Sequence, residues 1–222
     1  YNSSFQLNEA LNDPERRLLN RATQSAYPMG SIFKIVTMAT ALESGYYRSN
    51  TIYDCGYRFT ELPGVTLYDW TYTYQKSPSG KIDLVAGLVR SCNPYFWHIG
   101  LDLFKKGEAN DMVTHAEMFG LGRKTGIREL EEVAGQVLEP KSEGDAVQLS
   151  IGQGSMLATP LQVAVMISAI GNGGNLYRPY IVTKFTSADG EEITSTSPEV
   201  LSKLEERPQI MDVIRTGMRR VI

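Results

Sequence analysis

The feature that most constrains the fold is an apolar segment with helical spacing over residues 31–44. Its apolar positions cover well over half of a helical circumference, and Gly45 follows as a stop signal. These positions are Ile32, Ile35, Val36, Met38, Ala39 and Leu42. A helix with so wide an apolar surface must be buried on most sides. The core of the protein is therefore expected to form around this helix.

Helix caps and turn residues predict a mostly helical α+β protein. The expected helices cover residues 14–21 after Asp13-Pro14, then 31–44, 82–89, 94–104, 110–119, 160–170 and 210–222, with Ser197-Pro198 opening the C-terminal helices. Residues 51–70 mix β-branched and aromatic residues with glycine and proline, which predicts short strands. A strand over 180–185 is expected to turn at Asp189-Gly190 into a second strand near 191–194.

Composition narrows the possible functions. The chain has 222 residues, 42% of them hydrophobic and 21% charged, and a formal net charge of −3. This balance is typical of a globular protein and offers no basic excess for a phosphate backbone, so nucleic-acid binding is not expected. No apolar run approaches the roughly 20 residues of a membrane helix, and the N-terminus does not have the pattern of a signal peptide.

The cysteines and histidines do not predict a metal site. Cys55 and Cys92 lack zinc-ligand spacing and are too few for a disulfide scaffold, so they leave the compartment open. Cys55 is expected to be a packed core residue, and Cys92 has no histidine partner that would make it a nucleophile. His98 and His115 lie on expected helices without a third ligand. No metal and no cofactor are predicted.

Ser31-Ile32-Phe33-Lys34 places a hydroxyl and an amine three positions apart at the start of the apolar helix. Side chains at that spacing are neighbours. A lysine that apolar neighbours desolvate has a lowered pKa and can take the proton of a serine nucleophile. The alternative is that Ser31 caps the helix and Lys34 follows by chance, since about one such match is expected in a chain of this length.

Ser91-Cys92-Asn93 adds a second hydroxyl and a carboxamide on a loop between two expected helices. Alone, this segment reads as a polar turn. Together with Ser31 and Lys34 it forms two parts of the three-part motif set of penicillin-binding proteins and serine β-lactamases. The combination favours nucleophilic acyl transfer.

Longer segments also resemble one family, the transpeptidase domain of class B penicillin-binding proteins, which cross-link peptidoglycan. The resemblance covers nearly the whole chain. The segments are Leu18-Leu19-Asn20-Arg21-Ala22, Tyr27-Pro28-Met29-Gly30-Ser31-Ile32-Phe33-Lys34, Arg90-Ser91-Cys92-Asn93-Pro94-Tyr95-Phe96, Phe119-Gly120-Leu121-Gly122, Ser150-Ile151-Gly152-Gln153-Gly154 and Thr159-Pro160-Leu161-Gln162.

The resemblance implies an acyl-enzyme mechanism with no cofactor. Ser31 would attack a stem peptide ending in D-Ala-D-Ala, and Lys34 would act as general base. The backbone N–H of Ser31 would be one oxyanion donor. Ser91 would relay the proton to the leaving amine, and Asn93 would hold the substrate and orient Lys34. The acyl group would pass to an amine of a neighbouring stem peptide, and β-lactams would acylate Ser31. The parent protein would be a membrane-anchored enzyme on the extracytoplasmic face, working with a glycosyltransferase or with proteins of division or elongation.

The third family motif is not expected to be Lys124-Thr125-Gly126, because this segment precedes Ser150-Ile151-Gly152-Gln153-Gly154 whereas the family motif follows it. Residues 1–222 would then form a partial transpeptidase domain that contains the helical part of the fold and lacks much of the central antiparallel sheet. Such a fragment is expected to be inactive by itself and to self-associate through uncovered apolar faces.

Two other functions stay open at this point. A serine β-lactamase shares the first two motifs but needs an additional base that activates the deacylating water, and no residue of the sequence identifies one. A β-lactam sensor or a non-catalytic scaffold would use the same fold for binding. A sensor is acylated without transferring the acyl group to an amine.

Overall fold

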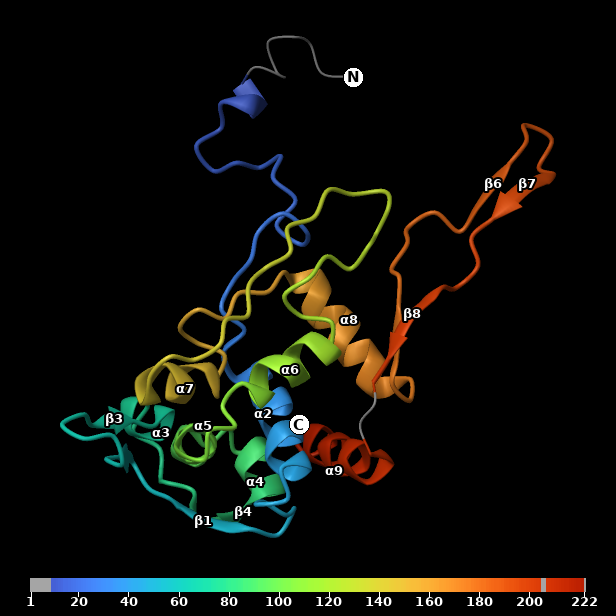
Figure 1. The fold of residues 1–222 in the computed structure, drawn as a ribbon. Helices are drawn as coiled ribbons and strands as arrows, with labels where there is room; N and C mark the ends of the chain where they lie inside the picture. The colour runs from blue at the N-terminus through green and yellow to red at the C-terminus, as the bar shows by residue number, and fades with distance from the viewer. Residues whose placement is uncertain (1–8, 205–206, 222) are drawn as a thin grey trace.

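The computed structural model describes residues 9–204 and 207–221, which fold into a mostly helical α+β protein with short strands (Figure 1). The helical elements are η1 (Gly30–Phe33), α2 (Lys34–Glu43), α3 (Trp70–Thr73), α4 (Leu84–Val89), α5 (Asn93–Lys105), α6 (Asp111–Met118), α7 (Glu143–Leu149), α8 (Pro160–Gly171) and α9 (Pro208–Arg219). The strands are β1 (Ile52–Cys55), β2 (Arg58–Phe59), β3 (Leu67–Tyr68), β4 (Gly80–Asp83), β5 (Asn175–Tyr177), β6 (Lys184–Thr186), β7 (Glu192–Ser195) and β8 (Val200–Lys203).

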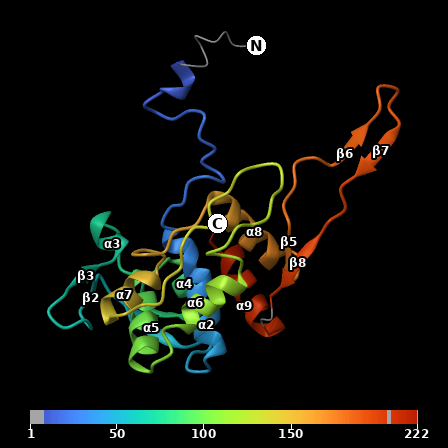
Figure 2. The same cartoon turned by 45° about the horizontal axis from the view of Figure 1, so that its top comes forward.

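Helix α2 lies at the centre of the helical core. Every residue from Lys34 to Ala41 is buried, and the helix contacts α4, α5, α6 and α9. Figures 1 and 2 show these helices grouped around α2 from two directions. The prediction that the core forms around residues 31–44 is therefore confirmed, and the Ser31-Ile32-Phe33-Lys34 segment leads directly into this buried helix.

The strands pair into four antiparallel sheets of two strands each among the described residues: β1 with β4, β2 with β3, β5 with β8, and β6 with β7. The expected strand near 191–194 is confirmed as β7. The preceding strand, β6, begins later than expected. It covers Lys184–Thr186, whereas the sequence predicts a strand over 180–185. The β6–β7 hairpin turns next to Gly190 and extends away from the helices in both views (Figures 1 and 2).

The expected C-terminal helix over 210–222 is confirmed as α9, but two predicted helix starts near the ends of the chain are wrong. Residues 13–21 form turns rather than a helix, although Asp13 accepts from the N–H groups of Glu15 and Arg17 as a cap would. Most of these residues are exposed, so no apolar contact stabilises a helix there. Ser197-Pro198 does not open a helix either. Strand β8 follows and pairs with β5, and α9 begins only at Pro208.

Among the described residues, no helix combines the length and the apolar character needed to cross a lipid bilayer.

Candidate active site

Ser31 and Lys34 lie at the junction of η1 and α2. The single 3₁₀ turn of η1 matters here because side chains three positions apart eclipse each other in such a turn. Ser31 is exposed at the surface, and Lys34 is fully buried beneath it. The fold therefore places an exposed hydroxyl and a buried amine three positions apart at this junction.

The glycine-rich segment around residue 152 holds the η1 turn in place. Gly30 adopts a φ of 57° and donates its N–H to the Gly152 carbonyl at 2.9 Å. A Cβ on Gly152 would lie 2.4 Å from the Gly30 carbonyl oxygen, so only glycine fits at this contact. Thr37 adds a second connection by donating to the Ser150 carbonyl at 2.8 Å. These contacts hold Ser31 in position against the glycine-rich segment.

Lys34 Nζ meets three acceptors, two from Ser91 in the loop between α4 and α5 and one from Asn93 at the start of α5. It donates to the Ser91 carbonyl at 2.8 Å, to Ser91 Oγ at 3.0 Å and to Asn93 Oδ1 at 2.6 Å. Burial lowers the pKa of Lys34 from its usual 10.5 to about 7, and the Asp69 carboxylate acts in the opposite direction. A large fraction of Lys34 is therefore neutral near pH 7 and able to accept a proton.

Ser91 Oγ lies between Lys34 and Ser31. It donates to Ser31 Oγ at 2.9 Å and accepts from Lys34 Nζ. The hydrogen-bonded path from the amine to the exposed hydroxyl thus runs through Ser91. Since hydroxyl hydrogens rotate, the same path can carry a proton in the opposite direction, from Ser31 towards a neutral Lys34.

The backbone of Ser91 is strained, and the strain aims its carbonyl at Lys34. Ser91 has a φ of 51° and occupies the left-handed position that ends α4. The N–H groups of Ser91 and Cys92 donate to the carbonyls of Leu88 and Gly87, the pattern of a Schellman motif. Glycine is the usual residue at such a position. Serine there costs on the order of 1 kcal/mol, which fits a position kept for its hydroxyl.

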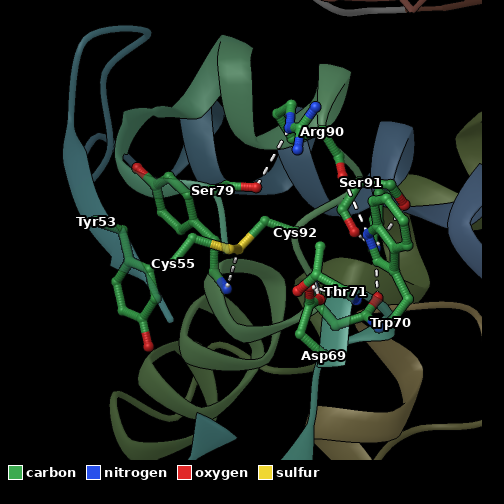
Figure 3. The surroundings of a disulfide bond; sticks show 12 residues. Tyr53, Cys55, Asp69, Trp70, Thr71, Ser79, Arg90, Ser91 and Cys92 are labelled. Carbon is green, nitrogen blue, oxygen red and sulfur yellow. Dashed lines mark hydrogen bonds between the residues drawn. A yellow bond between two sulfur atoms is a disulfide. The ribbon is translucent and has the colours of Figure 1, made fainter. Parts of the chain in front are cut away.

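Asn93 is the first residue of α5, and its amide oxygen faces Lys34 Nζ. The residue before it corrects a prediction made from the sequence. Cys92 forms a disulfide with Cys55 at the end of β1, so Cys55 is not simply a packed thiol and Cys92 is not free (Figure 3). The two cysteines are 37 positions apart, and only the folding of the intervening segment brings them together. The disulfide ties the loop of Ser91 and Asn93 to strand β1.

The sequence also gave no signal for Asp69, a fully buried carboxylate beside this loop. Its Oδ1 accepts the backbone N–H of Asn93 at 3.0 Å. The Asp69-Trp70 pair stands in a segment that only suggested short strands, and a lone aspartate before a short helix reads as an ordinary cap. Its contact with Asn93 bridges 24 positions and depends on tertiary structure.

An apolar groove of about 350 Å³ opens beside Ser31 and Ser91. Elements η1, α2, α4, α8 and α9, together with Val221 beyond the end of α9, supply its apolar walls, namely Ile32, Ile35, Leu88, Val89, Ile167, Met218 and Val221. Lys124-Thr125-Gly126 is not on a strand. It lies in the loop between α6 and α7, where the Glu132 carboxylate accepts from Thr125 and Gly126. The described residues contain no cluster of three or more potential metal ligands.

Comparison with known protein families assigns the chain. The penicillin binding protein transpeptidase domain matches residues 2–222. The chain belongs to this family. Among curated relatives, the peptidoglycan D,D-transpeptidase PbpA of Mycolicibacterium smegmatis is 32% identical over 196 residues, which are 84% of this chain and 37% of that protein. The chain spans about a third of the length of the curated relatives that it matches.

Solved structures of penicillin-binding proteins share the fold. The ceftriaxone acyl-enzyme complex of penicillin-binding protein A from M. tuberculosis superposes with a TM-score of 0.79 at 26% identity, over 96% of this chain and 48% of that chain. A structure of a peptidoglycan synthase complex that coordinates polymerization and crosslinking superposes with a TM-score of 0.83 at 27% identity, over all of this chain and 37% of that chain. The predicted family and fold class are confirmed.

Proposed function

We propose that the protein is a serine-type D,D-transpeptidase that cross-links peptidoglycan stem peptides and is acylated by β-lactams. The observation that carries this proposal is the hydrogen-bonded path from the buried Lys34 amine through Ser91 Oγ to the exposed Ser31 Oγ. The family assignment and the acyl-enzyme complex of the M. tuberculosis relative support it.

In the first step, Ser31 Oγ attacks the carbonyl carbon of the penultimate D-Ala residue of a stem peptide. As the Oγ–C bond forms, the Ser31 proton passes to Ser91 Oγ, and the Ser91 proton passes to neutral Lys34. The negative charge develops on the substrate oxygen. Because Ser31 lies in the first turn of η1, its backbone N–H is free of the helix's own hydrogen bonds and can donate to that oxygen.

In the second step, the bond to the terminal D-Ala breaks and its nitrogen takes the proton that Lys34 and Ser91 hold. An amine of a second stem peptide then attacks the acyl-serine carbonyl, and the same groups accept its proton and return one to Ser31. Asn93 orients Lys34 through the 2.6 Å hydrogen bond and offers its amide N–H₂ to the substrate backbone. The reaction consumes no cofactor.

We also propose that the catalytic domain works on the extracytoplasmic face of the membrane. The Cys55–Cys92 disulfide supports this location, since such bonds persist in oxidising compartments and are rare in the cytosol. A partner that polymerises glycan strands is proposed from the similarity to the peptidoglycan synthase complex. Residues 1–222 would supply the Ser31, Lys34, Ser91 and Asn93 part of a larger transpeptidase domain.

The test is an assay of the full-length protein with a donor stem peptide and an acceptor amine, which measures D-Ala release and cross-linked product by mass spectrometry. Wild type is expected to form cross-linked product, and Ser31→Ala to lose on the order of 10³-fold or more of the rate. Acylation by penicillin with no cross-linked product would instead favour a sensor or scaffold. Rapid hydrolysis of the penicilloyl adduct would favour a β-lactamase.

A further inference from the structure

Asp69 joins two helices from a fully buried position outside the four proposed site residues. One carboxylate oxygen, Oδ2, accepts from the backbone N–H of Thr71 at 3.2 Å and from its hydroxyl at 2.5 Å, which caps α3. The other oxygen, Oδ1, accepts from the backbone N–H of Asn93 at 3.0 Å. A cap of α3 alone would use one of these oxygens, so the bond to Asn93 is a separate role.

Asn93 connects Asp69 to Lys34. Its backbone N–H donates to Asp69, and its side-chain oxygen accepts from Lys34 Nζ at 2.6 Å. Asn93 is also the first residue of α5, where a negative charge is favoured by the helix dipole. A displacement of the Asp69 carboxylate would therefore move the residue that orients the proposed base.

The chain segment from Cys55 to Asp69 is held by a contact within the segment and by two contacts to α5 and its N-cap. The Asp69 N–H donates to the Tyr57 carbonyl at 2.9 Å, and the Phe59 ring packs on the Trp97 ring of α5 with centroids 5.7 Å apart. The Cys55–Cys92 disulfide holds the beginning of the segment to the N-cap of α5. Figure 3 shows the disulfide with Asp69 and Thr71 beside it, near Ser91. These contacts hold the Asp69 carboxylate in one position beneath the loop between α4 and α5.

The charge of Asp69 also acts on Lys34. The groups that face Lys34 Nζ directly are the neutral side chains of Ser91 and Asn93 and the Phe96 ring, whose centroid is 5.5 Å away. Among the described residues, Asp69 is the charged side chain whose field raises the pKa of Lys34 against the effect of burial. The amine thus has a buried counter-charge that it does not touch.

We propose that Asp69 is a positioning residue of the proposed acyl transfer, which holds Asn93 through its backbone and sets the protonation of Lys34 through its charge. The proposal rests on the proposed function of Ser31 and Lys34. It assigns two effects to Asp69, one on the rate and one on the pH dependence of the rate. Substitution of a residue needed only for folding would change the rate and leave its pH dependence unchanged.

The experiment measures the second-order rate of acylation of the full-length protein by a fluorescent penicillin from pH 5 to pH 9. With a pKa of about 7, roughly a tenth of Lys34 is neutral at pH 6. Asp69→Asn removes the charge that favours protonated Lys34, so the ratio of the rate at pH 6 to the rate at pH 8 is expected to rise by about threefold. The rate at pH 8 is expected to fall by about tenfold, because Asn93 is held less firmly.

Thr71→Val is the matched control, because it removes a hydrogen bond to Asp69 Oδ2 and keeps the charge. It is expected to leave the ratio of the two rates at the wild-type value. A wild-type ratio in folded Asp69→Asn would overturn the proposal. Asp69→Ser, which also removes the charge, carries the same prediction if Asp69→Asn is unfolded by circular dichroism. If both variants are unfolded, Asp69 is a folding residue and the proposal is wrong.

Ser31→Ala separates this proposal from the proposed function. Labelling of wild type together with loss of labelling in Ser31→Ala keeps the proposed function, whatever Asp69→Asn shows. Equal labelling of wild type and Ser31→Ala would refute the role of Ser31, and the role of Asp69 with it.

Discussion

Replacing Lys34 with methionine is expected to remove about 3 kcal/mol of pH dependence from the free energy of unfolding between pH 6 and pH 9. The physical reason is that the buried amine releases its proton far more easily in the folded protein than in the unfolded chain. Lys34 is fully buried, so its pKa falls from 10.5 to about 7. In the unfolded chain the amine is solvated and keeps its usual pKa.

The sign follows from the number of bound protons. Between about pH 7 and pH 10.5 the unfolded chain holds the Lys34 proton while the folded protein has released it. Stability therefore rises with pH in this window. Below pH 7 the folded protein carries the full cost of a buried ammonium, about 5 kcal/mol from the difference between 10.5 and about 7. The part recovered between pH 6 and pH 9 is about 3 kcal/mol.

Methionine fills a similar volume but does not titrate. It leaves the Ser91 carbonyl and Asn93 Oδ1 without the donor they have in wild type, which costs roughly 1–3 kcal/mol for each group. That cost is the same at every pH. The lost hydrogen bonds therefore shift the free energy of unfolding of Lys34→Met by a constant amount. The change with pH in the difference between Lys34→Met and wild type comes only from the titration of Lys34.

The assay is urea denaturation followed by circular dichroism at steps of half a pH unit from pH 6 to pH 9. Wild type is expected to gain about 3 kcal/mol relative to Lys34→Met across this range. The control is Lys124→Met, which replaces an exposed lysine and is expected to give a curve parallel to wild type. Parallel curves for wild type and Lys34→Met would show that the amine is not desolvated, and the proposed general base would lose its physical basis.

Two further substitutions test how the site is held. Ser91→Gly relieves the backbone strain at a φ of 51°, so it is expected to be about 1 kcal/mol more stable than Ser91→Ala by urea denaturation, while both variants lose acylation by penicillin. Equal stability of Ser91→Gly and Ser91→Ala would show that the backbone at residue 91 is not strained. Gly152→Ala places a Cβ 2.4 Å from the Gly30 carbonyl oxygen and is expected to destabilise the protein by about 3 kcal/mol, whereas Gly171→Ala, with no atom within 4 Å, stays within about 1 kcal/mol of wild type. A mild effect of Gly152→Ala on both stability and acylation would show that this contact does not hold η1.

The pairing of Ser31 with Lys34 could be predicted from the sequence because it is local. Because Ser31 and Lys34 are three positions apart at the start of an apolar helix, their side chains are expected to be neighbours and Lys34 to be buried. Helix α2 likewise follows from its apolar periodicity. Residues 13–21 carry equally good cap signals but no comparable apolar surface, and they form turns.

The features that local patterns missed depend on contacts between distant segments. The Cys55–Cys92 disulfide and the hydrogen bond from Asn93 to Asp69 require residues 52–69 to fold back on α5. From the sequence, Ser91 is expected to pass a proton only to the leaving amine. In the structure its hydroxyl also lies between Lys34 Nζ and Ser31 Oγ. Helix α7 has seven residues, which is too short for a clear helical period.

The measurement that tests the central claim most directly is peptide mapping of the full-length protein after reaction with penicillin. The account predicts one penicilloyl group on Ser31, no adduct in Ser31→Ala, and no adduct on residues 1–222 alone. Slow acylation of Ser31 in Lys34→Met would agree with the role of the amine as base. An adduct on Ser91 or on another residue, or an unmodified full-length protein, would contradict the assignment of Ser31 as the nucleophile.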